Sequence, residues 1–362
     1  MSATDVRPEV APVRPGEELD WPALEAYLRR ELPAVGLEVG GPMSVAQFPN
    51  GHANLTYLVT FDAGTRVVVR RPPMGRIAPG AHDMKREFRV LSRLWRVYDR
   101  APRAYLLCTD HDVIGADFVV SEYRTGVVIW DRWPESMCSL PDVARRAGFA
   151  TVDALADLHL VDPDECGLGD LGRPEGYLTR QVEGWRKRWE LVATPEIDEQ
   201  MVRLGDELRR RLPRSPAPVV LHNDFKMDNC QFAPGEPDRV VSVFDWDMAT
   251  LGDPLADVGM LLHYWPDPSD VEGDRPLHVP GMERMGLPTR AEVAGHYAAR
   301  TGADLSGIAW YEAFASWKIA VVCQQLSIRY LRGESTDERM AEQAGFPPRL
   351  ARRATRILET LR

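Results

Sequence analysis

The sequence predicts an α+β protein with two lobes: a small β-rich N-terminal lobe and a larger helical C-terminal lobe. Its 362 residues are more than one ordinary compact core usually holds. Short strand-like runs gather before about residue 122, whereas helical periodicity dominates after it. We therefore expect a flexible tail over residues 1–18, an N-terminal lobe over 19–122 and a helical lobe over 123–362.

The N-terminal lobe is expected to begin with a helix. Residues 20–32 have an amphipathic pattern, with Asp20 as N-cap and Pro22 in the first turn. A second helical stripe covers residues 82–98. Five apolar runs bounded by turn residues predict strands, at 43–48, 55–61, 65–71, 104–110 and 117–123.

The C-terminal lobe is expected to follow a hinge over residues 123–126. Four long segments have a helical pattern: 143–161, 176–192, 198–212 and 310–331. Two short strand-like runs lie between them, at 218–222 and 239–245. No internal repeat interrupts this organisation.

Composition narrows the class of protein. Acidic residues number 54 and basic ones 44, a net charge of −10 that argues against a nucleic-acid partner. The sequence contains no run of about 18 apolar residues, so a membrane span is not expected. The N-terminus lacks the apolar region of a secretory signal. The 5 cysteines form no C-x-x-C pair, so we expect reduced thiols in a cytoplasmic protein. The oligomeric state is not predicted.

The strongest chemical signal is the segment from His222 to Asn229, which reads H-x-D-x-x-x-x-N after a strand-like run. Phosphoryl transfer needs a carboxylate that accepts the hydroxyl proton and an oxygen ligand for Mg²⁺ nearby. Asp224 and Asn229 would supply both from one loop. The alternative is a polar turn in which these side chains only cap the backbone.

A second carboxylate cluster follows the strand-like run at 239–245. Asp245 stands where the strand ends and is the expected Mg²⁺ ligand. Asp247 is a second ligand, a supporting group or a solvent-facing cap. Asp253 and Pro254 have the pattern of a helix start, and Asp257 is expected to brace the catalytic loop by hydrogen bonds.

Two features of the N-terminal lobe are candidates for phosphate binding. The hairpin containing Asn50, Gly51 and Asn54 could cover phosphates with backbone N–H groups, or be an ordinary turn. Arg70 on a strand and Glu87 on the next helix could form a cation–carboxylate pair that holds phosphates, or a solvated surface pair. Side chains alternate along a strand, so Arg71 must face away from Arg70.

Together these segments resemble the aminoglycoside phosphotransferase family of the protein-kinase-like superfamily. HNDFKMDN, FDWDMATLGDPLAD, FPNGHANLTYLV, VVVRRPP and MKREF match in order and spacing. VVVRRPP, DWDMATLGDPLADVG and the run from LADLHLV to GWRKRW are closest to the branch also found joined to acyl-CoA dehydrogenases. The resemblance implies a protein-kinase-like fold that uses ATP or another nucleoside triphosphate with Mg²⁺.

The resemblance also implies residue roles. Asp224 would be the catalytic base, His222 would brace its loop, and Asn229 and Asp245 would hold Mg²⁺. Backbone at the hinge would pair with adenine, near Ser121, Glu122 and Tyr123. Arg70 departs from the superfamily, which has lysine there, and a planar guanidinium is not equivalent to a point charge.

The acceptor is expected to be a hydroxyl group of a small molecule. An acidic loop at 265–274 favours an aminoglycoside, whereas the basic, aromatic helix at 180–189 favours a hydroxyacyl-CoA. Aromatic residues are frequent in the C-terminal lobe and would suit an apolar acceptor. These residues are Tyr264, Trp265, Trp310, Tyr311, Phe314 and Trp317. The sequence therefore favours the acyl ester. The alternative classes are a nucleotide-binding regulatory protein without catalysis and a metal-dependent hydrolase. Retention of Asp224, Asn229 and Asp245 argues against the first, and scattered histidines argue against the second.

Overall fold

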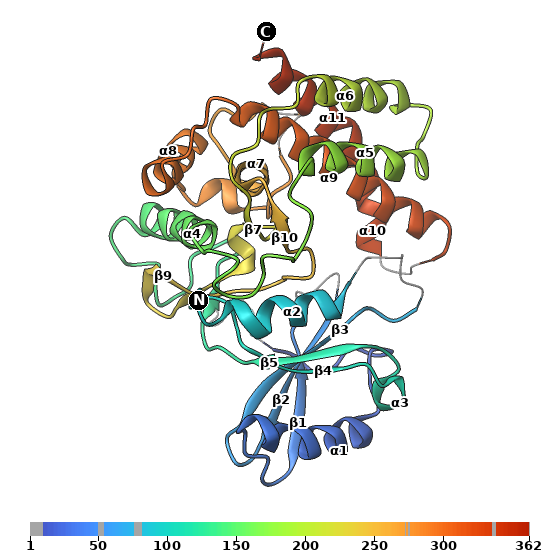
Figure 1. The fold of residues 1–362 in the computed structure, drawn as a ribbon, viewed down its shortest axis with the longest axis vertical. Helices are drawn as coiled ribbons and strands as arrows, with labels where there is room; N and C mark the ends of the chain where they lie inside the picture. The colour runs from blue at the N-terminus through green and yellow to red at the C-terminus, as the bar shows by residue number, and fades with distance from the viewer. Residues whose placement is uncertain are drawn as a thin grey trace, which may run out of the picture.

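The computed structural model describes residues 10–49, 54–75, 82–271, 273, 276–334 and 338–361. Figure 1 shows the first third of the chain as a sheet region in the lower part of the view, with the helices of the remaining chain above it. The predicted α+β class, with a β-rich N-terminal region and a helical C-terminal region, is confirmed.

The N-terminal region is built on one five-stranded antiparallel sheet with the order β1-β2-β3-β5-β4. Its strands are β1 (Met43–Gln47), β2 (Leu55–Phe61), β3 (Arg66–Arg71), β4 (Ala104–Cys108) and β5 (Phe118–Glu122). Three helices accompany it: α1 (Trp21–Glu31), α2 (Met84–Leu94) and α3 (His111–Ile114). Asp20 caps α1 by accepting a hydrogen bond from the Ala23 amide, as predicted.

Alternation along β3 determines which side chains reach the functional cleft. Val67 and Val69 are fully buried in the core beneath the sheet. Arg70 therefore projects from the opposite face, toward α2. Arg71 faces away, and its guanidinium donates to the Ile114 carbonyl at 2.8 Å.

Part of the predicted flexible tail is held to the sheet. Residues 1–9 lie outside the described residues, but Ala11 forms a β-bridge with Gln47. The Tyr57 hydroxyl donates to the Glu17 carbonyl at 2.6 Å, and the Gln47 amide reaches the Glu17 carboxylate at 2.5 Å. A segment without hydrophobic periodicity gives no sign of such long-range bonds, and Ala11 and Glu17 of the predicted tail contact the sheet through them.

The helical region is organised around α9, which is apolar on nearly every face and is packed against α5, α6, α7, α10 and α11. Its helices are α4 (Val143–His159), α5 (Tyr177–Glu190), α6 (Asp198–Arg210), α7 (Pro254–Tyr264), α8 (Arg290–Thr301), α9 (Ile308–Leu331), α10 (Glu338–Glu342) and α11 (Phe346–Glu359). No helix within the described ranges has the length and apolar character needed to span a membrane.

Two small sheets carry the loops that the sequence singled out. β7 (Val219–Leu221) pairs with β10 (Thr250–Gly252), and β6 (Val127–Val128), β8 (Cys230–Ala233) and β9 (Glu236–Val243) form the other sheet. Residues 222–229 connect β7 to β8, and residues 244–249 connect β9 to β10. Strand pairing therefore brings the two loops together, and the Phe244 amide donates to the Asn229 carbonyl at 3.1 Å.

Candidate active site

The loop of residues 222–229 is fixed by hydrogen bonds to its backbone. Asp257, at the start of α7, accepts from the His222 amide at 2.6 Å and from the Asn223 amide at 2.7 Å. His222 links the two loops: its Nε2 lies 3.0 Å from the Phe244 carbonyl, and its Nδ1 accepts from the Asp224 amide at 3.3 Å. The brace expected from Asp257 is therefore present. Through its two hydrogen bonds, the His222 ring also connects this loop to the loop after β9.

Asp224 lies on the cleft side of this loop, and its carboxylate is 3.2 Å from the ammonium of Lys226. Lys226 also lies 3.8 Å from Asp228 and sits over the Tyr264 ring. Burial would lower the pKa of Lys226, but the carboxylates of Asp224 and Asp228 raise it well above its usual value. The carboxylates therefore favour the charged ammonium beside the candidate base.

Sequence reasoning missed Lys226, although the motif contains it. The signal that could have found it is its scarcity, because this chain has only 4 lysines among its 44 Lys and Arg residues and one falls two positions after Asp224. A compact ammonium can donate in three directions, whereas a guanidinium is confined to a planar fork. Lys226 is placed to stabilise negative charge that develops near Asp224.

Asn229 and Asp245, the candidate metal ligands, face the same cleft. The Asn229 amide nitrogen donates to the Asp224 carbonyl at 2.9 Å, which orients its side chain. Asp245 has a positive φ of 75°, an unusual backbone conformation for a residue other than glycine. Burial alone would raise the pKa of Asp245, but the adjacent Arg70 guanidinium lowers it below its usual value. Asp245 is therefore kept ionised.

Arg70 bridges two carboxylates, Glu87 from α2 and Asp245 from the loop after β9. The Arg70–Glu87 ion pair measures 3.2 Å, and Arg70 also pairs with Asp245. Burial raises the pKa of Glu87 to about 7, despite the opposing effect of Arg70. The predicted strand–helix pair is present and buried, which removes the solvated-surface alternative. We call Arg70, Glu87 and Asp245 the clasp.

Of the remaining predicted residues of the N-terminal region, the structure describes only some. Asn50 and Gly51 lie outside the described residues. Asn54 is buried, and its amide donates to Asp247 at 3.1 Å, so its side chain contacts a carboxylate. Burial, followed by the nearby charge of Asp245, raises the pKa of Asp247. Asp247 is thus not a solvent-facing cap.

The predicted hinge residues Ser121, Glu122 and Tyr123 line the same cleft at the end of β5. The Glu122 carboxylate accepts from the Arg103 amide at 3.1 Å and from Arg124 at 3.1 Å. Arg124 also donates to the carbonyls of Ala101 and Val241. The hinge is therefore tied both to the sheet region and to β9.

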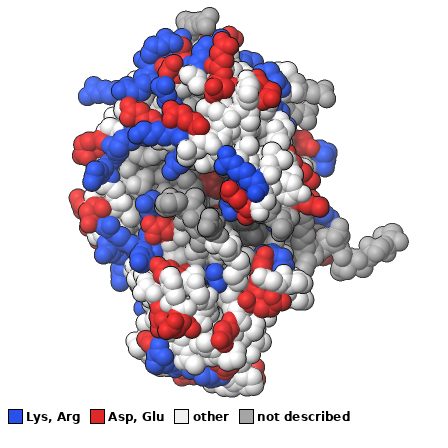
Figure 2. Space-filling view, turned by 90° about the vertical axis from the view of Figure 1, so that its right-hand side faces the viewer, with Lys and Arg blue, Asp and Glu red and all other residues white. Residues whose placement is uncertain are grey.

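The candidate base, the candidate metal ligands, the clasp and the hinge residues line one cleft of about 3170 Å³ between the sheet and the helices. Figure 2 shows the hollow that marks this junction on one face of the molecule. The wall contributed by α5 and α9 is basic and apolar, and among its described lining residues there is no carboxylate. Its lining residues are Tyr177, Arg180, Gln181, Trp185, Arg188, Lys318, Ile319, Val322, Cys323, Gln325, Leu326 and Arg329.

The aromatic residues expected to line an acceptor site are mostly core residues. Trp310, Tyr311, Phe314 and Trp317 are at most 3% exposed and pack inside the helical region. Tyr264 and Trp265 do border the cleft, and Trp185 on α5 joins them. The four aromatic residues in the first half of α9 are therefore core residues, and later residues of α9 form its part of the cleft wall.

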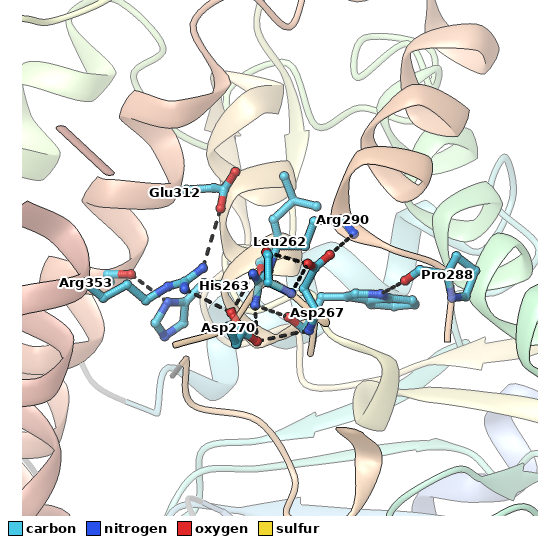
Figure 3. A network of polar contacts seen from close by, with 11 residues as sticks. Leu262, His263, Asp267, Asp270, Pro288, Arg290, Glu312 and Arg353 are labelled. Atoms are coloured by element: carbon cyan, nitrogen blue, oxygen red, sulfur yellow. Dashed lines mark hydrogen bonds and ion pairs between the residues drawn. The ribbon is translucent and has the colours of Figure 1, made fainter. Parts of the chain in front are cut away.

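Two carboxylates of the acidic loop that favoured a cationic acceptor, Asp267 and Asp270, are neutralised inside the protein, whereas Glu272 and Asp274 lie outside the described residues. Figure 3 shows Asp267 and Asp270 turned toward Arg290 and Arg353. Asp270 pairs with Arg290 at 2.7 Å and with Arg353 at 3.3 Å, and Asp267 accepts from the Arg290 amide at 2.7 Å. These carboxylates hold α7, α8 and α11 together and are not available to a cationic ligand.

The cleft has the donors that a metal–phosphate group requires. Within the described part of the chain, no set of three or more His, Cys, Asp or Glu residues is arranged to hold a metal alone. Buried polar atoms without a hydrogen-bond partner there include Nε of Arg70, Oε2 of Glu87 and Oδ1 of Asn54. Mg²⁺ usually takes one or two protein oxygens and completes its shell with phosphate and water. Asn229 and Asp245 fit that pattern.

Comparisons with known proteins identify relatives that are similar to most of this chain. A model of the phosphotransferase enzyme family matches residues 44–311. The rat protein named acyl-CoA dehydrogenase family member 11 is 33% identical over 92% of this chain and 42% of its own length. The chain therefore spans less than half of that relative.

Solved structures show the same fold. A Ralstonia eutropha protein provisionally named an aminoglycoside phosphotransferase is 30% identical, with a TM-score of 0.76 over 95% of this chain and 99% of that one. Choline kinase from Cryptosporidium parvum has a TM-score of 0.61 at 14% identity, over 94% of this chain and 95% of its own. The second match shows the fold alone.

Proposed function

The chain belongs to the phosphotransferase enzyme family, and from that premise we propose that it transfers the γ-phosphoryl group of ATP, or another nucleoside triphosphate, to a hydroxyl group of a hydroxyacyl-CoA or related anionic metabolite. The strongest support for phosphoryl transfer is that Asp224, Asn229 and Asp245 line one cleft together with the Arg70–Glu87 pair.

The mechanism follows from the position of each side chain. Asp224 accepts the proton of the acceptor hydroxyl as the oxygen attacks the γ-phosphorus, and the nucleoside diphosphate leaves. Lys226, beside Asp224, offsets negative charge on the transferred group. Arg70 holds phosphate oxygens from the sheet side. Mg²⁺, held by Asn229 and Asp245, would screen the charge of the phosphates.

The nature of the α5–α9 wall supports an anionic, partly apolar acceptor. Arg180, Arg188 and Arg329 border it together with Trp185 and Leu326. Arginines bind phosphates, and an apolar groove accepts an acyl chain. The pairing of Asp270 with Arg290 weakens the sequence feature that favoured a polycationic sugar. The similarity to acyl-CoA dehydrogenase family member 11 also favours an acyl ester.

The test is phosphate transfer from radiolabelled ATP and Mg²⁺ to hydroxyacyl-CoAs, the matching free hydroxy acids and kanamycin-like sugars. We expect the CoA esters to be the best acceptors. Arg188→Gln should raise KM for the CoA ester more than for the free hydroxy acid, whereas Arg203→Gln, on the exposed side of α6, should change neither. Efficient transfer to aminoglycosides with no turnover of any acyl ester would exclude the proposed acceptor.

A further inference from the structure

Asn223, the residue before the candidate base, has a strained backbone. Its φ is 68°, in the left-handed region that residues other than glycine seldom occupy. Such a conformation persists only when its surroundings impose it. Because Asn223 and Asp224 share a peptide bond, the orientation of Asp224 depends on whatever holds Asn223 in place.

Four hydrogen bonds hold Asn223, which is 9% exposed. Its amide N–H donates to Asp257 at 2.7 Å, and its side-chain nitrogen donates to the Met248 carbonyl at 2.8 Å. Its side-chain oxygen accepts from the Tyr177 hydroxyl at 2.7 Å, and its carbonyl accepts from Lys318 at 3.0 Å. Both backbone groups and both side-chain polar atoms therefore have a partner.

The four partners come from two sides of the molecule. Asp257 and Met248 lie on α7 and on the loop after β9, which already belong to the catalytic machinery. Tyr177 and Lys318 lie on α5 and α9, the helices that form the basic wall of the cleft. Figure 1 shows α5 beside α9, and the two helices are in contact.

The burial of the Lys318 ammonium at this position is energetically unfavourable. It is 5% exposed, its ammonium lies 5.6 Å from the Trp185 ring centre, and no carboxylate of the described residues forms an ion pair with it. Burial of an ammonium without a paired charge is unfavourable, and an apolar side chain of similar shape would be easier to accommodate. Burial lowers the pKa of Lys318 accordingly. In a chain with 4 lysines, the retained ammonium points to a specific task.

Tyr177 is held just as firmly. Its ring is 4% exposed and packs against the backbone of β10. A Cβ atom added to Gly252 would lie 2.9 Å from that ring, so the close approach depends on glycine. The hydroxyl therefore has little freedom to leave Asn223.

We propose that Lys318 and Tyr177 are positioning residues, which fix the direction of Asp224 by holding Asn223 and so make the base depend on the α5–α9 wall. The inference rests on the proposed function for its catalytic consequence, although the contacts themselves do not. A ligand that packs against this wall would contact the same helices that orient the base.

The test uses Lys318→Met and Tyr177→Phe, each in the full chain. Both should lower kcat for phosphoryl transfer, by up to about 10²-fold for Lys318→Met and less for Tyr177→Phe, because small misplacements of a reacting group are costly. KM for the nucleotide should stay within about twofold, since the clasp is untouched. Matched controls are Tyr98→Phe, whose buried hydroxyl bonds the distant Ala154 carbonyl, and Lys187→Met on the exposed side of α5; both should keep wild-type kcat.

Two further readouts separate positioning from general stability. Amide hydrogen exchange over residues 219–229 should rise in Lys318→Met and Tyr177→Phe but not in the controls. Added ethylamine, and not ethanol, should restore part of the kcat lost by Lys318→Ala. Wild-type kcat and wild-type exchange in both variants would overturn the inference. If Lys318→Met does not fold, Tyr177→Phe, which lacks only one oxygen atom, decides.

The failure of the proposed function can be told apart from failure of this inference. If the wild-type protein phosphorylates no acceptor, the function is wrong, and the exchange measurement alone judges whether Lys318 and Tyr177 hold the loop. If transfer occurs and the exchange of residues 219–229 is unchanged by either substitution, the positioning role is wrong and the function stands.

Discussion

The catalytic loop on the helical side of the cleft and the clasp on the sheet side differ in how completely their polar groups are hydrogen-bonded. On the helical side, every backbone and side-chain polar group of Asn223 has a partner, and His222 and Asp257 tie the same loop to its neighbours. On the sheet side, the clasp contains buried polar atoms without a hydrogen-bond partner among the described residues, including Nε of Arg70 and Oε2 of Glu87.

This difference indicates which half of the site a ligand completes. The catalytic loop is ordered by the protein's own hydrogen bonds, so it needs no ligand to reach its geometry. In the clasp, Arg70 lies between Glu87 and Asp245, with Asp247 nearby. Burial, and after it the neighbouring carboxylates, raises the pKa of Glu87 and Asp247. A metal ion with phosphates would provide the missing charges of both signs.

The largest effect should come from the helical side. Asp224→Asn removes the proposed base and should lower phosphoryl transfer by about 10²–10⁴-fold. Nucleotide affinity should change little, because the loop is held through its backbone and through Asn223. Calorimetric titration with Mg²⁺ and a nucleotide, run beside the transfer assay, checks both parts. An equal loss of affinity would make Asp224 a binding residue.

The next largest effect should come from Asp245→Asn. An amide is a poorer ligand than a carboxylate for a hard dication, and the substitution also removes a partner of Arg70. Mg²⁺-dependent nucleotide affinity should fall by at least about 10–100-fold, the range seen when even supporting groups of a metal site are removed. Normal Mg²⁺-dependent binding and turnover in this variant would show that the metal assignment is wrong.

Arg70 and Glu87 should show unequal effects. Arg70→Ala should raise the nucleotide concentration needed for half-maximal rate, and Glu87→Ala should raise it less, because Glu87 acts through Arg70. Arg70→Lys should fall between Arg70→Ala and wild type, since one ammonium cannot copy both arms of the guanidinium. Steady-state kinetics at varied ATP measure the order. Unchanged KM for ATP in all three variants would remove Arg70 from the binding site.

The smallest effect concerns stability and pH. The pKa of Glu87 is about 7 in the folded protein against 4.5 ordinarily, so between these values the folded state binds more protons than the unfolded state. The free energy of unfolding contributed by Glu87 should therefore fall as pH rises from 4.5 to about 7. Glu87→Gln should lose this dependence. Denaturant unfolding of both proteins across that range tests the sign, and parallel curves would contradict it.

Local patterns were sufficient for the elements and for much of the site. The caps of α1 and α7 and the five strands of the N-terminal sheet were predictable, because each depends on spacing within a few residues. The brace by Asp257 spans 35 positions and was expected from the motif that contains it, not from local spacing. The opposite directions of Arg70 and Arg71 followed from strand alternation.

Contacts between distant segments were not predictable in this way. Lys318 lies 95 positions from Asn223, and Glu17 lies 40 positions from Tyr57, so no local spacing links them. The same limitation misled the assignment of aromatic residues on α9. A helix that is apolar on nearly every side gives little periodic signal for which face is core, and Trp310 and Trp317 proved to be buried.

The contrast between the two sides of the cleft is tested most directly by amide hydrogen exchange of the wild-type protein, with and without Mg²⁺ and a non-hydrolysable ATP analogue. Peptides over residues 219–229 should already exchange slowly without ligand and change little when it binds. Peptides over residues 66–71, 84–94 and 244–249 should become markedly more protected. Equal protection gained on both sides, or a fast-exchanging loop at 219–229 in the free protein, would contradict the account.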